Sequence, residues 1–327
     1  MIIYFITQCI RFEYCYSLAC LLTALVNEID LDLLMRLNNN ITGAALMTGC
    51  MFAYVINDAF MKLLFSEIAL FQAIFLRSII TILPILVMAW ITKTAILNLS
   101  NQDRRLLLGR TGSEVCATVA FLVALKHMPL ANVTAILQAL PLAITMAAAL
   151  FLSEPVGWRR WIAILLGFIG VLIIVRPGFE GFNIYSLSAL AAIIFITIRE
   201  IFTRKLTSKV PIITVALTTV IGIGVFSGIM MIGTEWHPVS ASSWLLILGA
   251  GVAVLIATFL SVMAMQTGEI SFVSTFRYTA MLAAIGVGIL IFNDWPDQMT
   301  LVGTVIIIIT GVYSFYREQI HSKKATT

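Results

Sequence analysis

Ten long apolar stretches, separated by short polar connections, dominate the chain. Each stretch is close to the ~20 residues that an α-helix needs to cross a ~30 Å hydrocarbon layer. Turn-forming dipeptides such as Glu154-Pro155 and His237-Pro238 fall between the stretches and indicate where helices end. The predicted spans are 42–62, 67–90, 106–126, 130–152, 158–176, 185–203, 211–233, 242–266, 270–292 and 299–316. The pattern predicts an all-α membrane protein with ten transmembrane helices.

A charged pair on the first span recurs in the second half of the chain. Asp58 and Lys62 lie four residues apart, and Glu200 and Arg204 repeat that spacing at a shift of 142 in residue number. A second correspondence, at a shift of 140, aligns 130–143 with 270–283. The same two shifts match Phe60 with Phe202 and Glu154 with Asp294.

Two related halves with an odd number of helices each must lie upside down relative to one another in the membrane. We therefore expect a five-plus-five inverted repeat, an arrangement that many secondary transporters use. The expected units are an amino-terminal extension over 1–41, a first repeat over 42–178, a second repeat over 185–316 and a tail over 317–327.

The amino-terminal extension does not fit the ten-helix pattern. Its apolar segment, 14–26, is too short to span a bilayer and lacks the small-residue cleavage site of a signal peptide. Two interpretations stay open. Either Met35 is the true start of the protein, or the segment forms a helix at the membrane surface.

Composition supports lipid as the main solvent. The chain has 327 residues, of which 61% are hydrophobic and 11% are charged, whereas a soluble domain has about 25% charged residues. A net charge of +4 is too small to indicate nucleic acid as a partner. The five cysteines show no CxxC spacing, and the three histidines lie outside the spans. With no HExxH, GxSxG or Walker motif present, we expect neither an enzyme, a metal site nor a cofactor.

Positive charges gather on one side of the predicted topology, as they do on the cytoplasmic side of membrane proteins. The larger group is Arg36, Lys93, Arg104, Arg105, Arg159, Arg160, Arg204, Lys205, Lys209, Arg317, Lys323 and Lys324, and the opposite side holds Lys62, Lys126 and Arg176. This bias places both ends of the ten-helix body in the cytoplasm.

Two segments resemble the ends of the EamA repeats of the drug/metabolite transporter superfamily. "FLSEPVGWRRWIAILLGFIGVLIIVRPG" (Phe151 to Gly178) has an acidic residue and a Trp before a glycine-spaced helix that ends in Arg-Pro-Gly. "IFNDWPDQMTLVGTVIIIITGVYSFYRE" (Ile291 to Glu318) is similar to the matching end of the second repeat. The resemblance covers roughly 42–316. It implies ten helices and the movement of a small metabolite by alternating access.

The substrate does not follow from this resemblance. The stretch 109–161 is similar to alphaproteobacterial members, among which riboflavin importers occur. Within the superfamily, an amino-acid or drug exporter and an S-adenosylmethionine importer stay open as well. A membrane scaffold without transport activity is the alternative from another functional class.

Ionisable residues within the spans are the first candidates for a substrate site, because a charge in hydrocarbon costs about 2.5–3.5 kcal/mol even on the gentler insertion scales. Arg77, Glu114 and Arg277 lie near the middle of their spans, where inverted-repeat transporters place their sites. Arg110 lies four residues before Glu114, so we expect the two to neutralise each other. Three arginines and one glutamate favour an anionic or hydrogen-bond-accepting ligand.

The repeated charged pairs suggest gates. By the predicted topology, Asp58 and Lys62 lie near the outer face and Glu200 and Arg204 near the inner face. Each pair would break as its face opens. The alternative is an ordinary surface pair four residues apart on a helix, worth about 0.2–0.5 kcal/mol.

Other residues complete the predicted site. Gln138, Tyr54, Phe195 and Tyr278 are expected to line it, with the rings stacking on a planar ligand. Pro141 is the expected hinge, since a proline inside a helix bends it and frees carbonyl groups. Separately, Gly224 and Gly228 form a GxxxG motif, which permits close helix contact either within the protein or in a homodimer.

The energy source is open. No ATP-binding motif is present, so transport would depend on an ion gradient, an exchanged partner or the substrate's own gradient. Asp58, Glu114 and Glu200 are the carboxylates that could carry a proton, and the sequence does not choose among them.

Overall fold

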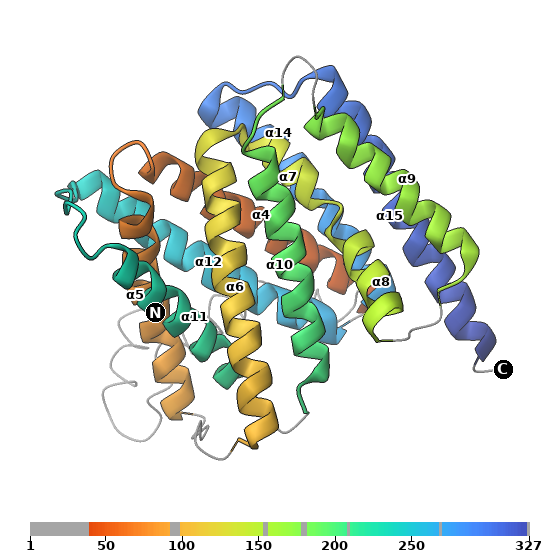
Figure 1. The fold of residues 1–327 in the computed structure, drawn as a ribbon, viewed down its shortest axis with the longest axis horizontal. Helices are drawn as coiled ribbons and strands as arrows, with labels where there is room; N and C mark the ends of the chain where they lie inside the picture. Colours follow the sequence, from red (N-terminus) through yellow and green to blue (C-terminus); the bar gives the residue numbers. More distant parts are fainter. Residues whose placement is uncertain are drawn as a thin grey trace, which may run out of the picture.

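The computed structural model describes residues 39–91, 99–152, 156–177, 182–207, 210–267 and 270–325 (Figure 1). Within these ranges every regular element is a helix. Nine helical stretches in them are long and apolar enough to cross a membrane, and Gln298–Ser314 is a shorter apolar helix. The prediction of ten membrane helices is thereby confirmed. The segment 14–26 and Met35 lie outside the described residues.

Each half of the chain contributes the same series of helices. The first half holds α4 (Asn39–Leu64), α5 (Leu70–Ile91), α6 (Asn101–His127), α7 (Leu130–Leu137), α8 (Leu140–Phe151) and α9 (Trp158–Val175). The second half holds α10 (Ser186–Lys205), α11 (Ile212–Met230), α12 (Ala241–Thr267), α13 (Ile270–Thr275), the 3-10 helix η1 (Phe276–Tyr278), α14 (Thr279–Phe292) and α15 (Gln298–Ala325).

The helix boundaries reproduce the repeat found in the sequence. The first residues of α5 and α11 differ by a shift of 142, and those of α6 and α12 by a shift of 140. The starts of α9 and α15 are again related by the shift of 140. The helices of one half therefore correspond to those of the other by the same two shifts that relate the sequence segments.

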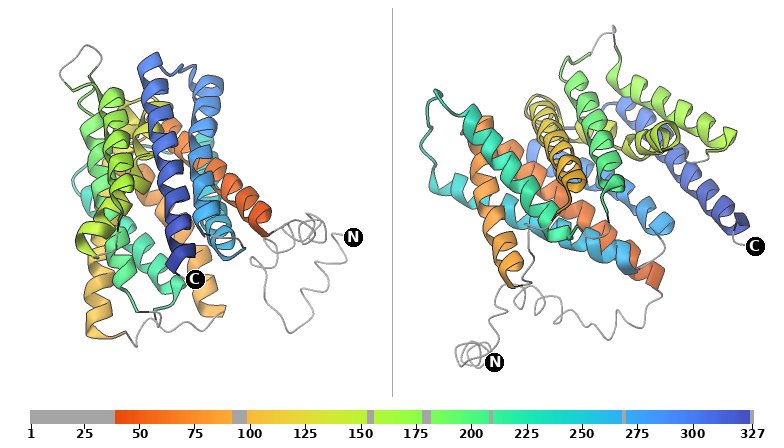
Figure 2. Two further views of the ribbon diagram at one scale, coloured as in Figure 1. Left: turned by 90° about the vertical axis from the view of Figure 1, so that its right-hand side faces the viewer. Right: turned by 60° about the horizontal axis from the view of Figure 1, so that its bottom comes forward.

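The most extensive helix contacts join the two halves. Helix α4 packs on α12, α10 on α6, α9 on α15 and α5 on α11. The first two pairs are equivalent under the repeat, and the last two each join equivalent helices. In the ribbon views, α6 and α10 run side by side, while α9 and α15 form one edge of the molecule (Figures 1 and 2).

Individual contacts between glycine and phenylalanine residues follow the same repeat. An added Cβ at Gly249 on α12 would lie 2.7 Å from the ring of Phe60 on α4. At Gly109 on α6 it would lie 2.8 Å from the ring of Phe202 on α10. The two glycines are related by the shift of 140 and the two phenylalanines by the shift of 142, so the same close contact occurs once in each half. Absence of a side chain at both positions lets the helices approach.

Two predicted spans are broken helices. The span 130–152 divides at Gln138 and Ala139 into α7 and α8, and the span 270–292 passes through η1. The breaks meet, because the Gln138 side chain donates a hydrogen bond to the Tyr278 carbonyl oxygen at 3.0 Å. Gln138 and Tyr278 are themselves equivalent at the shift of 140. Discontinuous helices of this kind are typical of the centre of inverted-repeat transporters.

The GxxxG motif lies against α5 within the chain. An added Cβ at Gly224 would lie 3.3 Å from Ser78, and at Gly228 it would lie 3.2 Å from the ring of Phe75. Of the two interpretations of this motif, close contact within the protein is the one observed.

Alanine at Gly303 should destabilise the α9–α15 edge, because its methyl group would lie 2.6 Å from the Gly170 carbonyl oxygen. Overpacking of a core costs about 1–3 kcal/mol. We expect a lower midpoint of thermal unfolding for the purified variant in detergent. Gly112→Ala is the matched control, since nothing lies within 4 Å of the added methyl group. Equal midpoints for the two variants would contradict this packing.

Candidate functional site

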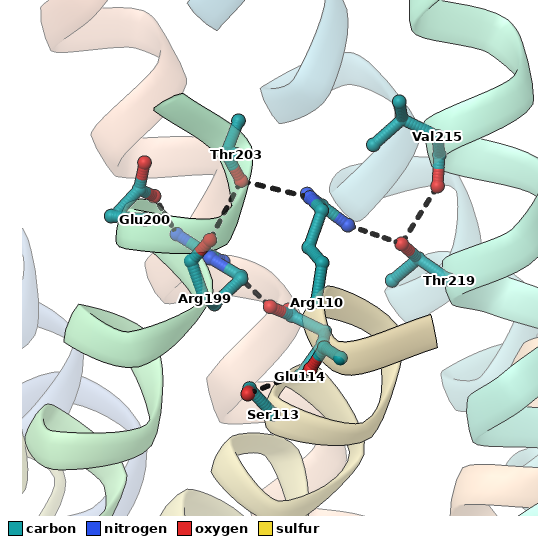
Figure 3. Close-up of polar contacts among 9 residues, drawn as sticks. Arg110, Ser113, Glu114, Arg199, Glu200, Thr203, Val215 and Thr219 are labelled. Atoms are coloured by element: carbon teal, nitrogen blue, oxygen red, sulfur yellow. Dashed lines mark hydrogen bonds and ion pairs between the residues drawn. The ribbon is translucent and has the colours of Figure 1, made fainter. Parts of the chain in front are cut away.

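Charged side chains from both halves meet between α6 and α10 (Figure 3). Arg199 on α10 donates a hydrogen bond to the Glu114 carboxylate on α6 at 2.8 Å, and also donates to its neighbour Glu200. The three side chains are 20–31% exposed, so they are largely removed from solvent. One guanidinium therefore serves two carboxylates, one from each repeat.

Arg110 does not form the expected ion pair with Glu114. Its Nε donates to the Thr203 hydroxyl at 3.0 Å and its Nη1 to the Thr219 hydroxyl at 2.5 Å (Figure 3). Arg110 reaches toward α11 as well as α10, while Glu114 faces Arg199. The two residues share a helix face and interact electrostatically, but each takes its hydrogen-bond partners from the neighbouring helices.

A second polar group links α4 to α5. The amide of Asn57 donates to the Asp58 carboxylate at 2.9 Å, and Arg77 donates to the Asn57 carbonyl oxygen at 3.2 Å. Arg77 also interacts electrostatically with Asp58 and Glu114. Arg77 thus stands between the two polar groups, near the middle of α5 as the sequence indicated.

Arg277 lies at the break η1 and faces the centre of α4. It interacts electrostatically with Cys50 and Tyr54, and Tyr54 also interacts with Arg199. The Arg277 Nε is buried without a hydrogen-bond partner among the described residues. The ion pairs found in the described part of the chain do not include Arg277. This guanidinium is therefore a cation whose counter-charge is not supplied by those residues.

The remaining predicted lining residues are dispersed. Gln138 is engaged by the Tyr278 backbone, as described above. The Tyr278 ring points toward α15, since an added Cβ at Gly311 would overlap its hydroxyl group. Phe195 is half-buried on α10, one turn before Arg199. Pro141 lies in the first turn of α8, directly after the break, where a helix tolerates proline.

Lys62 pairs with Asp294 of the other repeat and not with Asp58. Its ammonium donates to the Met128 carbonyl oxygen at 2.7 Å, lies 3.6 Å from the Asp294 carboxylate and stands over the Phe292 ring at 4.9 Å. Lys62 is in the last turn of α4, so its long side chain extends past the helix end. The expected pairing of Asp58 with Lys62 is wrong for this conformation. Glu200 likewise takes Arg199 as its partner, and its expected pairing with Arg204 is not observed.

Several further bonds join the repeats near Lys62. The Gln72 amide donates to the His237 carbonyl oxygen at 2.7 Å and accepts from the His237 N–H at 3.1 Å. The Glu67 carboxylate accepts hydrogen bonds from Ser240 and Ser243 at the start of α12. We call this face, at which α4 ends and α5 begins, the Lys62 end.

Arg176 and Asp297 form an ion pair at the same face. Partial burial acts to raise the pKa of Asp297, but the Thr300 backbone N–H and the Arg176 guanidinium outweigh it and hold the pKa below its usual value. The pair is therefore charged at neutral pH. At the opposite face, Asp103 accepts hydrogen bonds from the Thr207 N–H at 3.2 Å and from its hydroxyl at 3.1 Å.

Arg199 is the site residue that sequence reasoning missed. It lies four residues before the predicted end of the span 185–203, further from the middle of its span than Arg77, Glu114 and Arg277. Helix α10 continues to Lys205, and Glu114 on α6 faces Arg199 from inside. The available signal was the repeat, because Arg199 occupies the position of Asn57, beside a carboxylate in both halves.

No group of three or more His, Cys, Asp or Glu side chains in the described ranges could hold a metal ion. The polar centre instead consists of arginines, carboxylates and hydroxyl groups. Such a set can bind an organic molecule through hydrogen bonds and charge.

Similar proteins are consistent with this architecture. A riboflavin transporter of Vibrio cholerae is 30% identical over 57% of this chain and 62% of its own length. An S-adenosylmethionine uptake transporter of Rickettsia conorii is 27% identical over 58% of this chain and 65% of its own length. These matches thus span less than two thirds of each relative. A pseudopaline exporter of Pseudomonas aeruginosa is 25% identical over 83% of this chain and 95% of its own length.

One solved crystal structure aligns with 84% of this chain and 98% of its own, with a TM-score of 0.59 and 17% identity. That likeness shows the fold. The model of the EamA-like transporter family matches the chain twice, over residues 41–176 and 183–316. The chain therefore has two copies that match the family model, ten membrane helices, and a repeat that is seen in both the helix packing and the helix breaks. This multi-pass membrane protein belongs to the EamA-like transporter family.

Proposed function

We propose that the chain is a secondary-active transporter that moves a small organic metabolite across the bacterial inner membrane by alternating access. The observation that carries this proposal is the meeting of Glu114 from one repeat with Arg199 from the other, inside the helix bundle. A bond between repeats at the centre of the membrane is where relative motion of the repeats would act on a bound molecule.

The contacts at the Lys62 end support a carrier closed at that face. Lys62, Gln72 and Glu67 all bond to the other repeat there. The excess of positive residues at the opposite face supports placing that face in the cytoplasm. On this orientation both ends of the ten-helix body are cytoplasmic, and the Lys62 end is the periplasmic gate.

Arg277 favours a substrate with an anionic or hydrogen-bond-accepting group. Its guanidinium would donate to a carbonyl, carboxylate or phosphate oxygen, and a cationic substrate would be repelled. Riboflavin is neutral and rich in acceptor atoms, whereas S-adenosylmethionine carries a sulfonium cation. We therefore propose riboflavin as the first substrate to test, a choice that the likeness to the Vibrio cholerae riboflavin transporter also supports.

Purified full-length chain in proteoliposomes should take up labelled riboflavin saturably, and Arg277→Gln should reduce that uptake about 10–100-fold. The reason is the loss of a charge-assisted hydrogen bond, worth about 1.5–3 kcal/mol. Arg159→Gln is the control, because Arg159 is exposed beside Trp158 at the start of α9. Uptake of S-adenosylmethionine without uptake of riboflavin would make S-adenosylmethionine the substrate. Equal riboflavin uptake by Arg277→Gln and Arg159→Gln would show that Arg277 is not part of the site.

Lys62→Met should open the proposed periplasmic gate. In a chain that keeps Cys50 as its single cysteine, we expect faster labelling of Cys50 by an impermeant maleimide added outside right-side-out vesicles. Cys50 is fully buried on α4 when the gate is closed. Asp294→Asn should act in the same way, and exchanging the two charges should restore slow labelling. Lys126→Met is the control, being exposed at the same face; matching rates for Lys62→Met and Lys126→Met would refute the gate.

A further inference from the structure

Two carboxylates are equivalent under the repeat but have different partners. Asp58 and Glu200 are related by the shift of 142, and each is bonded by the residue before it. Before Glu200 stands Arg199, a cation. Before Asp58 stands Asn57, a neutral amide, which donates to the carboxylate at 2.9 Å. The same position in the fold thus holds one carboxylate paired with a guanidinium and one that is not.

Asp58 has no direct cation in the described part of the chain. No ion pair within 4.0 Å of its carboxylate is found there. Arg77 is the cation that interacts electrostatically with Asp58, and it donates to the Asn57 carbonyl oxygen, on the other side of the amide. An ionised carboxylate within the membrane is unfavourable without a paired charge, and a bound proton removes that charge.

The helices around Asp58 add few charges. Helices α12 and α14 pack on α4 and contain no Asp, Glu, Lys, Arg or His. Helix α6 contributes Glu114, which interacts with Arg77, and η1 contributes Arg277. Lys62, one turn further along α4, is engaged by Asp294 and the Met128 carbonyl oxygen. The charge state of Asp58 is therefore sensed chiefly by Arg77.

Arg77 connects Asp58 to the centre of the protein. It interacts electrostatically with both Asp58 and Glu114, and Glu114 is bonded to Arg199. When Asp58 is ionised, Arg77 is drawn toward Asn57 and Asp58. When Asp58 holds a proton, that attraction is lost, and Arg77 is freer to interact with Glu114. Protonation of Asp58 would thus change the electrostatic interactions of Glu114, whose bond to Arg199 joins the repeats.

We propose that Asp58 binds the proton that drives transport. One proton binds the carboxylate from the side to which the carrier is open and is released on the other side in the same cycle as the substrate. This inference rests on the proposed function. It assigns different roles to the repeat-related carboxylates, with Asp58 as the proton site and Glu200 as a fixed partner of Arg199.

The test uses the full-length chain in proteoliposomes with riboflavin as the probe. For each variant, uptake is measured with an imposed pH gradient and without one, and the ratio of the two is compared. Riboflavin counterflow, with no gradient, reports how much working carrier is present. We expect a several-fold ratio for the unchanged protein and a ratio of one for Asp58→Asn. Glu200→Gln, the repeat-related control, should keep a several-fold ratio.

A second measurement follows the proton directly. A pH-sensitive dye trapped inside the liposomes should report acidification when riboflavin is added outside the unchanged protein, and none with Asp58→Asn. Counterflow without acidification or gradient stimulation in the unchanged protein would overturn the proton site while leaving the transporter intact. A several-fold gradient ratio in Asp58→Asn would also overturn it. Absence of counterflow in the unchanged protein would instead reject riboflavin transport, and this inference with it.

Discussion

A charged side chain inside a lipid-facing bundle needs a partner, because hydrocarbon offers none. In this fold the partners come largely from the other repeat. Glu114 meets Arg199, Arg110 meets Thr203 and Thr219, and Lys62 meets Asp294. Since a single repeat lacks these partners, the two halves depend on each other both for their buried charges and for their apolar packing.

Symmetry in shape and asymmetry in charge have separate roles. The contacts of Phe60 with Gly249 and of Phe202 with Gly109 are the same contact made twice, and they fix how the halves pack. Glu114 has no such counterpart, because α12 has Val254 at the equivalent position. A group that occurs in only one half is not required by the repeated packing. The one-sided charges are therefore the part of the interior that is available for function.

The sequence predicted the spans correctly, because these depend on hydrophobic periodicity and composition. It did not predict the bonding partners of the charged side chains. Pro141 indicated that the span 130–152 would bend, and the chain does break just before it. Nothing comparable marks η1, which has neither proline nor glycine, and only its equivalence to the region of Gln138 could have indicated a break. Arg110 and Glu114 were assigned to each other because spacing along one helix is visible in a sequence, whereas Arg199 is brought near only by the packing of α10.

The sequence by itself determined the membrane environment, the number of spans and the two-fold repeat, because each depends on residues close together or on a fixed shift in residue number. It also indicated several charges within the spans, Arg77, Glu114 and Arg277, although it missed Arg199. Only the tertiary structure decided which of those charges are paired. Contacts between α6 and α10 join residues 85 positions apart, as in Arg199 with Glu114, and such a pairing is set by the packing of whole helices. That packing brings Arg199 of one repeat to Glu114 of the other.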